Sequence, residues 1–180
     1  MPESIENYTP QIVPKHIKKQ AITAWSLGFA IVFLWVFVIL LAPFAEANGL
    51  TYISGPIYKF FSFLCHQIPS RSFHVENHAF AVCTRCFGVY SGLLLGFIIY
   101  PFFRRIEEIE PLPRVWLFLA LVPMGIDWSL GFFEIWENTA FSRFITGMIL
   151  GVACAIFIIP ALVELLRLLS NKRQVKRLSK

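Results

Sequence analysis

The chain has 180 residues, of which 57% are hydrophobic and 15% are charged, whereas a soluble domain carries about 25% charged residues. This composition excludes an ordinary soluble domain. The net charge of +5 would suit a nucleic-acid-binding protein. However, the basic residues gather beside apolar segments rather than in one patch, so we expect no nucleic-acid partner.

The first apolar segment is residues 21–45, which follow a polar cytoplasmic lead at residues 1–20. The segment has no charged residue, and a helix of about 20 apolar residues is long enough to cross a membrane. Ala45-Glu46-Ala47 has the form of a signal-peptidase site. Because the apolar run is longer than the roughly 7–15 residues of a signal peptide, we expect a retained transmembrane span.

The interval 46–85 is expected to be a loop outside the membrane. Its first part, residues 50–64, is apolar and aromatic but too short to span, and Gly55-Pro56 is expected to interrupt a helix there. We therefore predict an interfacial or re-entrant segment. Residues 65–85 form the polar remainder of the loop.

The polar part of this loop concentrates side chains that bind soft metals or exchange disulfides. They are Cys65, His66, His74, His78, Cys83 and Cys86. Three cysteines and one histidine would satisfy a tetrahedral zinc ion. Because His66 directly follows Cys65 and adjacent residues chelate awkwardly, His78 or His74 is the alternative histidine ligand.

Cys83 and Cys86 flank the N-terminus of the second predicted span, with Arg85 between them. The helix dipole and the arginine both favour thiolate, which is the form that binds metals and attacks disulfides. Three alternatives stay open for the cysteines: a metal site, a redox-active pair with Cys65 as relay, or a structural disulfide. Cys154, in the middle of an apolar segment, is expected to be a packing residue.

Three further spans are predicted at residues 86–103, 115–134 and 144–164, followed by a basic tail at 166–180. The expected fold class is an all-α integral membrane protein, with four transmembrane helices in one domain, residues 21–165. When four spans alternate, twelve of the sixteen basic residues fall on the side of both termini. The positive-inside rule then places both termini in the cytoplasm and the cysteines on the extracytoplasmic side of the cell membrane.

A second polar group is centred on Asp127, a carboxylate within the third predicted span. Ionisable residues inside a membrane are costly and mark functional sites by default. Asp127 could form a purely structural pair with Arg143 or Arg85. Alternatively, Asp127 or His66 is a general base, while Arg85 and Arg143 bind an anionic headgroup. We expect both polar groups to meet at one membrane face.

Glycines recur at every fourth position on two of the predicted spans. They are Gly88, Gly92 and Gly96 on the second span, and Gly147 and Gly151 on the fourth. Small residues at this spacing let helix backbones approach closely in lipid. We expect these faces to pack against other helices and to offer a contact for a homo-oligomer.

Two motifs surround the cysteines: Cys65-His66-Gln67 with Arg71-Ser72-Phe73, and Cys83-Thr84-Arg85-Cys86-Phe87-Gly88 with Tyr90. Together with Pro123-Met124-Gly125-Ile126-Asp127 later in the chain, they resemble a family of small prokaryotic integral membrane proteins catalogued as a domain of unknown function. The resemblance covers residues 60–160 and names no reaction. The positions that it implies for the family's pattern are Cys65, His66, Arg71, Cys83, Arg85, Cys86, Asp127 and Arg143.

The preferred hypothesis is a membrane enzyme with a zinc–thiolate centre that acts on a lipid or another amphipathic substrate. The first alternative is a thiol–disulfide oxidoreductase that uses Cys83 and Cys86 with Cys65 as relay. The second alternative is a transporter or assembly factor whose cysteines form a structural metal site or a disulfide. Metal content and the oxidation state of the cysteines would discriminate between these hypotheses.

Overall fold

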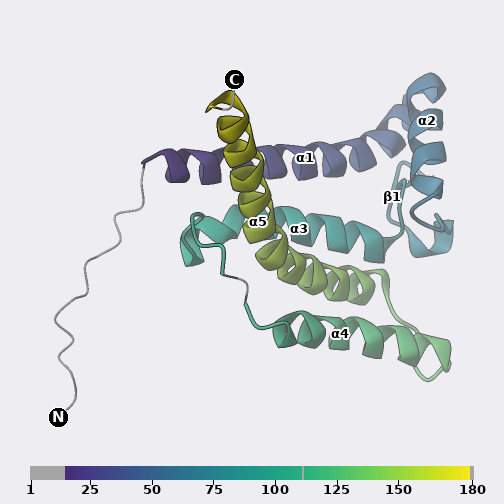
Figure 1. Cartoon of the computed structure of the whole chain (residues 1–180). Helices are drawn as coiled ribbons and strands as arrows, with labels where there is room; N and C mark the ends of the chain where they lie inside the picture. Colours follow the sequence, from purple (N-terminus) through teal and green to yellow (C-terminus); the bar gives the residue numbers. More distant parts are fainter. Residues whose placement is uncertain (1–14, 111, 179–180) are drawn as a thin grey trace, which may run out of the picture.

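The computed structural model describes residues 15–110 and 112–178 and is mostly helical (Figure 1). Its elements are α1 (Lys15–Ala47), α2 (Thr51–Ser62), the short 3-10 helix η1 (Pro69–Arg71), β1 (His74–Val75), β2 (His78–Ala79), α3 (Thr84–Phe103), α4 (Val115–Phe132) and α5 (Ala140–Leu178). Four of these helices, α1, α3, α4 and α5, are long and apolar enough to cross a membrane. The prediction of four spans is confirmed.

The start of α1, the turn between α3 and α4 and the later part of α5 meet at one end of the bundle, which we call the terminal end. There the Gln20 side chain donates a hydrogen bond to Ser170 Oγ over 2.9 Å. The Arg167 guanidinium donates to the Glu107 carbonyl over 2.8 Å. This arrangement agrees with four alternating spans, while the side of the membrane remains a prediction from charge.

The closest helix contact joins α3 and α5 through their glycines. A Cβ atom added at Gly88, Gly92, Gly147 or Gly151 would collide with a backbone carbonyl oxygen of the opposite helix. The two glycine faces therefore pack against each other within one chain. These faces are therefore covered within the chain, and the expected homo-oligomer stays a prediction.

The apolar first part of the segment between the first two spans is one continuous helix, α2, which lies across the end of α1 (Figure 1). The predicted interruption at Gly55-Pro56 is therefore wrong. Tertiary packing offsets the helix-weakening effect of these two residues, because Phe61 is buried against α1 and the fully buried Ser54 hydroxyl donates to the Glu46 carboxylate. The crossing direction favours an interfacial helix over a re-entrant one.

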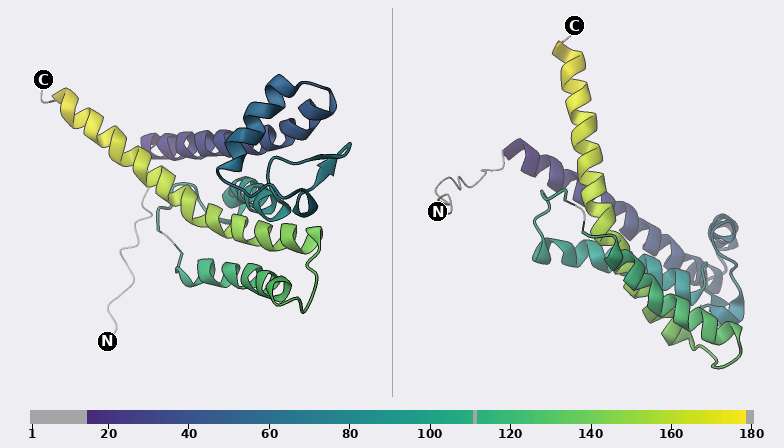
Figure 2. Two further views of the ribbon diagram at one scale, coloured as in Figure 1. Left: turned by 90° about the vertical axis from the view of Figure 1, so that its right-hand side faces the viewer. Right: turned by 60° about the horizontal axis from the view of Figure 1, so that its bottom comes forward.

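The other helices depart from the predicted boundaries at two places. α1 begins at Lys15, inside the predicted lead of residues 1–20, of which residues 1–14 lie outside the described residues. α5 runs without a break from Ala140 to Leu178, so the predicted tail at 166–180 continues the fourth span as far as the structure describes it. Figure 2 shows this later part of α5 extending past the rest of the bundle. α4 lies at the edge of the bundle and packs mainly against α5.

The polar loop before α3 contains a small hairpin that the sequence did not predict. β1 and β2 pair antiparallel, with Val75 opposite His78. The two turn residues, Glu76 and Asn77, have φ angles of 47° and 66°, the left-handed conformation that two-residue hairpin turns require. After the hairpin, residues 80–83 are buried among α1 and α2, which returns the chain to the start of α3.

Candidate functional site

Two cysteines from separate parts of the loop lie in contact at the start of α3. Cys65 follows α2, and Cys83 is the residue before the first turn of α3. The Cys83 amide donates a hydrogen bond to Cys65 Sγ over 3.1 Å. The two residues are only 8% and 5% exposed, and neither forms a disulfide.

His66 completes a group that could hold a metal ion. One side-chain donor atom from each of Cys65, His66 and Cys83 lies within 4.8 Å of the others. Within the described part of the chain, this group contains neither of the hairpin histidines, His74 and His78. The structure therefore does not bring the predicted ligand His78 into the group.

The side chain of Gln67 holds the two cysteine-bearing segments together. Its amide nitrogen donates to the carbonyl oxygens of Tyr58 and Ala81, each over 2.8 Å. Tyr58 belongs to α2, and Ala81 precedes Cys83 by two residues. Gln67 was not predicted as a site residue. The sequence feature that could have identified Gln67 is its position in the Cys65-His66-Gln67 motif.

Cys86 was also predicted as a metal ligand. In the structure its thiol interacts with Cys83. A hydrogen bond from the Cys86 thiol is the main cause that lowers the pKa of Cys83 to about 4, although burial opposes the change. A smaller contribution comes from Cys65. The lowered pKa favours the Cys83 thiolate, which is the form that binds metals and attacks disulfides.

The hydrogen bonding of His66 limits how its ring can bind a metal. Its Nδ1 atom accepts a hydrogen bond from the Ile68 amide over 3.0 Å. A neutral ring with an accepting Nδ1 carries its proton on Nε2. Metal binding by His66 therefore releases the Ile68 amide: either Nδ1 binds the metal in its place, or Nδ1 takes up the ring proton and Nε2 binds the metal.

Asp127 anchors the second polar group. Its Oδ2 atom forms an ion pair with Arg85 and accepts a hydrogen bond from the Asn138 amide nitrogen over 3.2 Å. Its Oδ1 atom accepts from Ser142 Oγ over 2.8 Å. Asp127 thus pairs with Arg85, whereas Arg143 donates to Asn138 Oδ1 over 3.1 Å.

These residues border a small pocket at the same end of the bundle as the cysteines. The pocket has a volume of about 100 Å³, and its walls are Arg71, Arg85, Trp128, Gly131, Phe132, Asn138 and Arg143. Arg71 is held there by its backbone, because Thr84 Oγ1 donates to the Arg71 carbonyl over 3.2 Å. We call this space the arginine pocket.

The first turn of α3 serves both groups. Cys83 and Cys86, three residues apart, interact with each other, and residues at this spacing share a helix face. Arg85, between them, pairs instead with Asp127 of α4. The predicted convergence of the cysteines with Asp127 therefore occurs at one turn of helix. Ser142, a further donor to Asp127, was not predicted, since a serine in an apolar helix carries no distinctive pattern.

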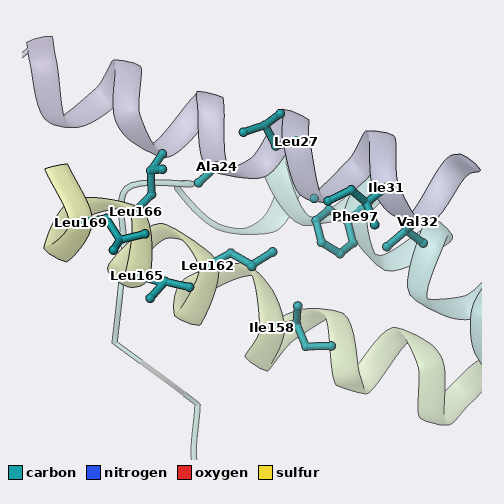
Figure 3. A pocket seen from close by; sticks show the side chains of 11 residues that line it. Ala24, Leu27, Ile31, Val32, Phe97, Ile158, Leu162, Leu165, Leu166 and Leu169 are labelled. Carbon is teal, nitrogen blue, oxygen red and sulfur yellow. The ribbon is translucent and has the colours of Figure 1, made fainter. Parts of the chain in front are cut away.

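A larger apolar pocket lies away from both groups. It has a volume of about 300 Å³ and lies between α1, α3 and α5 (Figure 3). Its walls are hydrocarbon side chains such as Leu27, Phe97 and Leu162. These side chains neither bind metals nor transfer protons, so we place the candidate chemistry at the cysteines and the arginine pocket.

Comparison with known proteins agrees with the interpretation of this chain as a membrane protein. The model of the family described as "predicted membrane protein (DUF2085)" matches residues 65–157, which include both polar groups. An uncharacterised protein of Methanocaldococcus jannaschii is 38% identical over 146 residues, covering 78% of this chain and 91% of that protein. Another, of Methanothermobacter thermautotrophicus, is 31% identical over 96 residues, covering 53% and 85%.

No solved structure matches this chain. The family match extends over more than half of the sequence, and the similarity to the Methanocaldococcus protein extends further, to 78% of it. The four apolar helices agree with the description of the family. This multi-pass membrane protein therefore belongs to the DUF2085 family.

Proposed function

We propose that this protein is a metal-dependent membrane enzyme that acts on a lipid or another amphipathic substrate. The observation that carries the proposal is the group formed by Cys65, His66 and Cys83, with donor atoms within 4.8 Å of one another. Three protein ligands leave one position of a tetrahedral metal open. An open position is typical of catalytic sites, whereas four protein ligands are typical of structural ones.

Zinc is the metal that we propose for this site. Two thiolates and one imidazole are ligands that zinc favours. Bound zinc would polarise a carbonyl or phosphoryl oxygen, or lower the pKa of a bound water. Because both oxygens of Asp127 already accept hydrogen bonds, we assign Asp127 to positioning Arg85. His66, as the third ligand of the proposed site, is assigned to the metal and not to proton transfer.

The location of the site suits a substrate that resides in the membrane. The cysteines and the arginine pocket lie at one end of the four apolar helices. We assign this end to the extracytoplasmic side of the cell membrane, because the basic residues gather at the opposite end. A lipid headgroup lies at that depth, so the proposed site and the proposed substrate meet there.

Metal content of serine variants tests the proposal. We expect about one zinc per purified wild-type chain, and loss of zinc in Cys65→Ser and Cys83→Ser. Cys154→Ser is the matched control, because Cys154 lies in α5, far along the sequence from the group. We expect Cys86→Ser to retain zinc. Wild-type protein without metal rejects the proposal, and equal loss in Cys86→Ser indicates a closed structural site.

A thiol–disulfide oxidoreductase is the second candidate. It is favoured by the pKa of about 4 at Cys83 and by the neighbouring thiol of Cys86, since a low-pKa cysteine with a second cysteine nearby is typical of such enzymes. Maleimide trapping in cells, with and without prior reduction, distinguishes it. Cysteines that never change oxidation state would eliminate this candidate.

A further inference from the structure

The arginine pocket carries more positive charge than the surrounding side chains neutralise. Three guanidinium groups, of Arg71, Arg85 and Arg143, border it, and the neighbouring carboxylate is Asp127. That carboxylate forms its ion pair with Arg85. Among the side chains that the structure describes, Arg71 and Arg143 form no ion pair. The pocket thus has two positive charges without a carboxylate partner.

Donor groups in the pocket are also left without acceptors. None of the described residues accepts a hydrogen bond from the buried Nε atom of Arg85. Among the same residues, the Arg143 guanidinium donates to the neutral oxygen of Asn138. Buried donors and charges are costly unless they are satisfied. An anion in the pocket would supply both the missing charge and the missing acceptors.

The number of arginines indicates the class of anion. A guanidinium group presents a planar fork of donors that matches the oxygens of a carboxylate or a phosphate. One arginine already suffices for the two oxygens of a carboxylate, whereas a phosphate offers more oxygens and can accept from several arginines together. A pocket of about 100 Å³ admits a group of this size but not a whole lipid.

Two aromatic side chains indicate what is attached to the anion. Trp128 and Phe132 form part of the pocket wall and stack on each other, with ring centroids 5.1 Å apart. They remain 54% and 64% exposed on α4, at the edge of the bundle. Trp at the membrane interface is typical of contacts with lipid headgroups. The pocket therefore combines a cationic interior with an apolar rim.

From these features we infer that the arginine pocket binds the phosphate group of a phospholipid headgroup. The inference that the pocket binds a phosphate group rests on the charges of its arginines and on its two aromatic side chains. That the bound lipid is also the substrate rests on the proposed function. It is supported by Arg85, which enters the pocket from the same helical turn that carries Cys83 and Cys86.

The test measures binding of short-chain phosphatidic acid to the purified full chain in detergent, by calorimetry or native mass spectrometry. Short-chain diacylglycerol, which lacks the phosphate, is one comparison ligand, and inorganic phosphate is the other. We expect phosphatidic acid to bind, diacylglycerol not to bind, and inorganic phosphate to bind much more weakly. Equal affinity for phosphatidic acid and diacylglycerol overturns the phosphate site, and equal affinity for phosphatidic acid and inorganic phosphate overturns the lipid assignment.

Variants of one arginine locate the binding. Arg143→Gln should weaken phosphatidic acid binding by roughly tenfold to a hundredfold, since hydrogen bonds to charged groups are lost. Arg143→Lys keeps the charge without the planar fork and should give an intermediate loss. Arg105→Gln, an exposed arginine in the α3–α4 turn, is the matched control. Unchanged affinity in both folded Arg143 variants overturns the inference.

Metal content separates this inference from the proposed function. Arg143→Gln should keep its zinc, and Cys83→Ser, which should lose zinc, should still bind phosphatidic acid. If wild-type protein holds zinc but does not bind the lipid, the phosphate site alone is wrong. If wild-type protein binds the lipid but contains no metal, the proposed enzyme alone is wrong.

Discussion

The two ends of the bundle are held together by different interactions. At the terminal end, aliphatic side chains such as Ala21, Val163 and Leu166 pack against one another, and the hydrogen bonds of Gln20 and Arg167 involve no carboxylate. At the cysteine end, directional contacts join separate segments, including the bonds of Gln67 and the Arg85–Asp127 pair. Apolar packing is enough to close a membrane bundle. The costly polar contacts at the other end therefore indicate where function resides.

The largest effect on folding is expected at the contact between α3 and α5, which runs between the two ends of the bundle. Gly92→Leu places a side chain where even a Cβ would collide with the Met148 carbonyl, and backbone cannot move aside as a flexible side chain can. We expect loss of folded protein in detergent, measured by size-exclusion chromatography. Gly125→Leu is the control, because a Cβ at Gly125 meets no atom within 4 Å. Equal yields of folded protein would contradict this packing.

Breaking an ion pair should be costly at the cysteine end and nearly neutral at the terminal end. Asp127→Ala leaves Arg85 without its charge partner, and we expect a loss of about 3 kcal/mol in the free energy of unfolding. Glu108→Ala breaks the Arg104–Glu108 pair, in which Glu108 is 48% exposed, so we expect less than about 1 kcal/mol. Chemical unfolding in detergent measures both, and comparable losses would remove the distinction between the ends.

Gln67→Ala should have an intermediate effect that is confined to the cysteine end. The change removes two hydrogen bonds, to Tyr58 and Ala81, and we expect a loss of about 1–3 kcal/mol in the free energy of unfolding. Zinc affinity should fall as well, since the segment that carries Cys65 is no longer held. Gln20→Ala, which removes one hydrogen bond to Ser170, is the control. A Gln67→Ala protein with wild-type zinc affinity would show that Gln67 does not position the site.

A change in stability that depends on pH is expected from titration of Cys83. A pKa lowered to about 4 in the folded protein contributes stability that is full above the unfolded thiol value of about 8.5 and is lost as the pH falls toward 4. Because the Cys86 thiol donates to this thiolate and keeps its own proton, the folded pair holds one proton over this range whereas the unfolded pair holds two. Metal-free wild type should therefore lose more melting temperature than Cys83→Ser between pH 8 and pH 4. An identical loss would argue against the thiolate.

The features predicted from the sequence are those that depend on local composition or on membrane alternation. The four spans follow from runs of apolar residues, and the approach of Asp127 to Arg85 follows from the length of the spans between them. The continuity of α2 through Gly55-Pro56 was not predicted, because its stability comes from packing against α1. The pairing of Gly92 with Met148 was not predicted either, since spacing identifies a glycine face but not the helix that covers it.

The contacts of the site divide in the same way, into those that the sequence indicates and those that depend on the fold. Cys65, Cys83 and Cys86 could be grouped from the sequence because cysteines are rare and were close along the chain. The bonds of Asn138 and Ser142 to Asp127 could not be derived, because amide and hydroxyl side chains have many alternative partners. His78 was proposed as a ligand from its position in the loop, but the hairpin turn at Glu76 and Asn77 holds it in β2.

The glycine contact between α3 and α5 also fixes the geometry of the arginine pocket. A Cβ at Gly147 would meet the carbonyl oxygen of Arg85 itself, and Gly147 is one helical turn beyond Arg143. The separation between these two arginines is therefore set by main chain against main chain, with no side chain as a spacer. Substitutions elsewhere on α3 and α5 can alter the surface that the protein presents to lipid while the two guanidinium-bearing turns keep the same register.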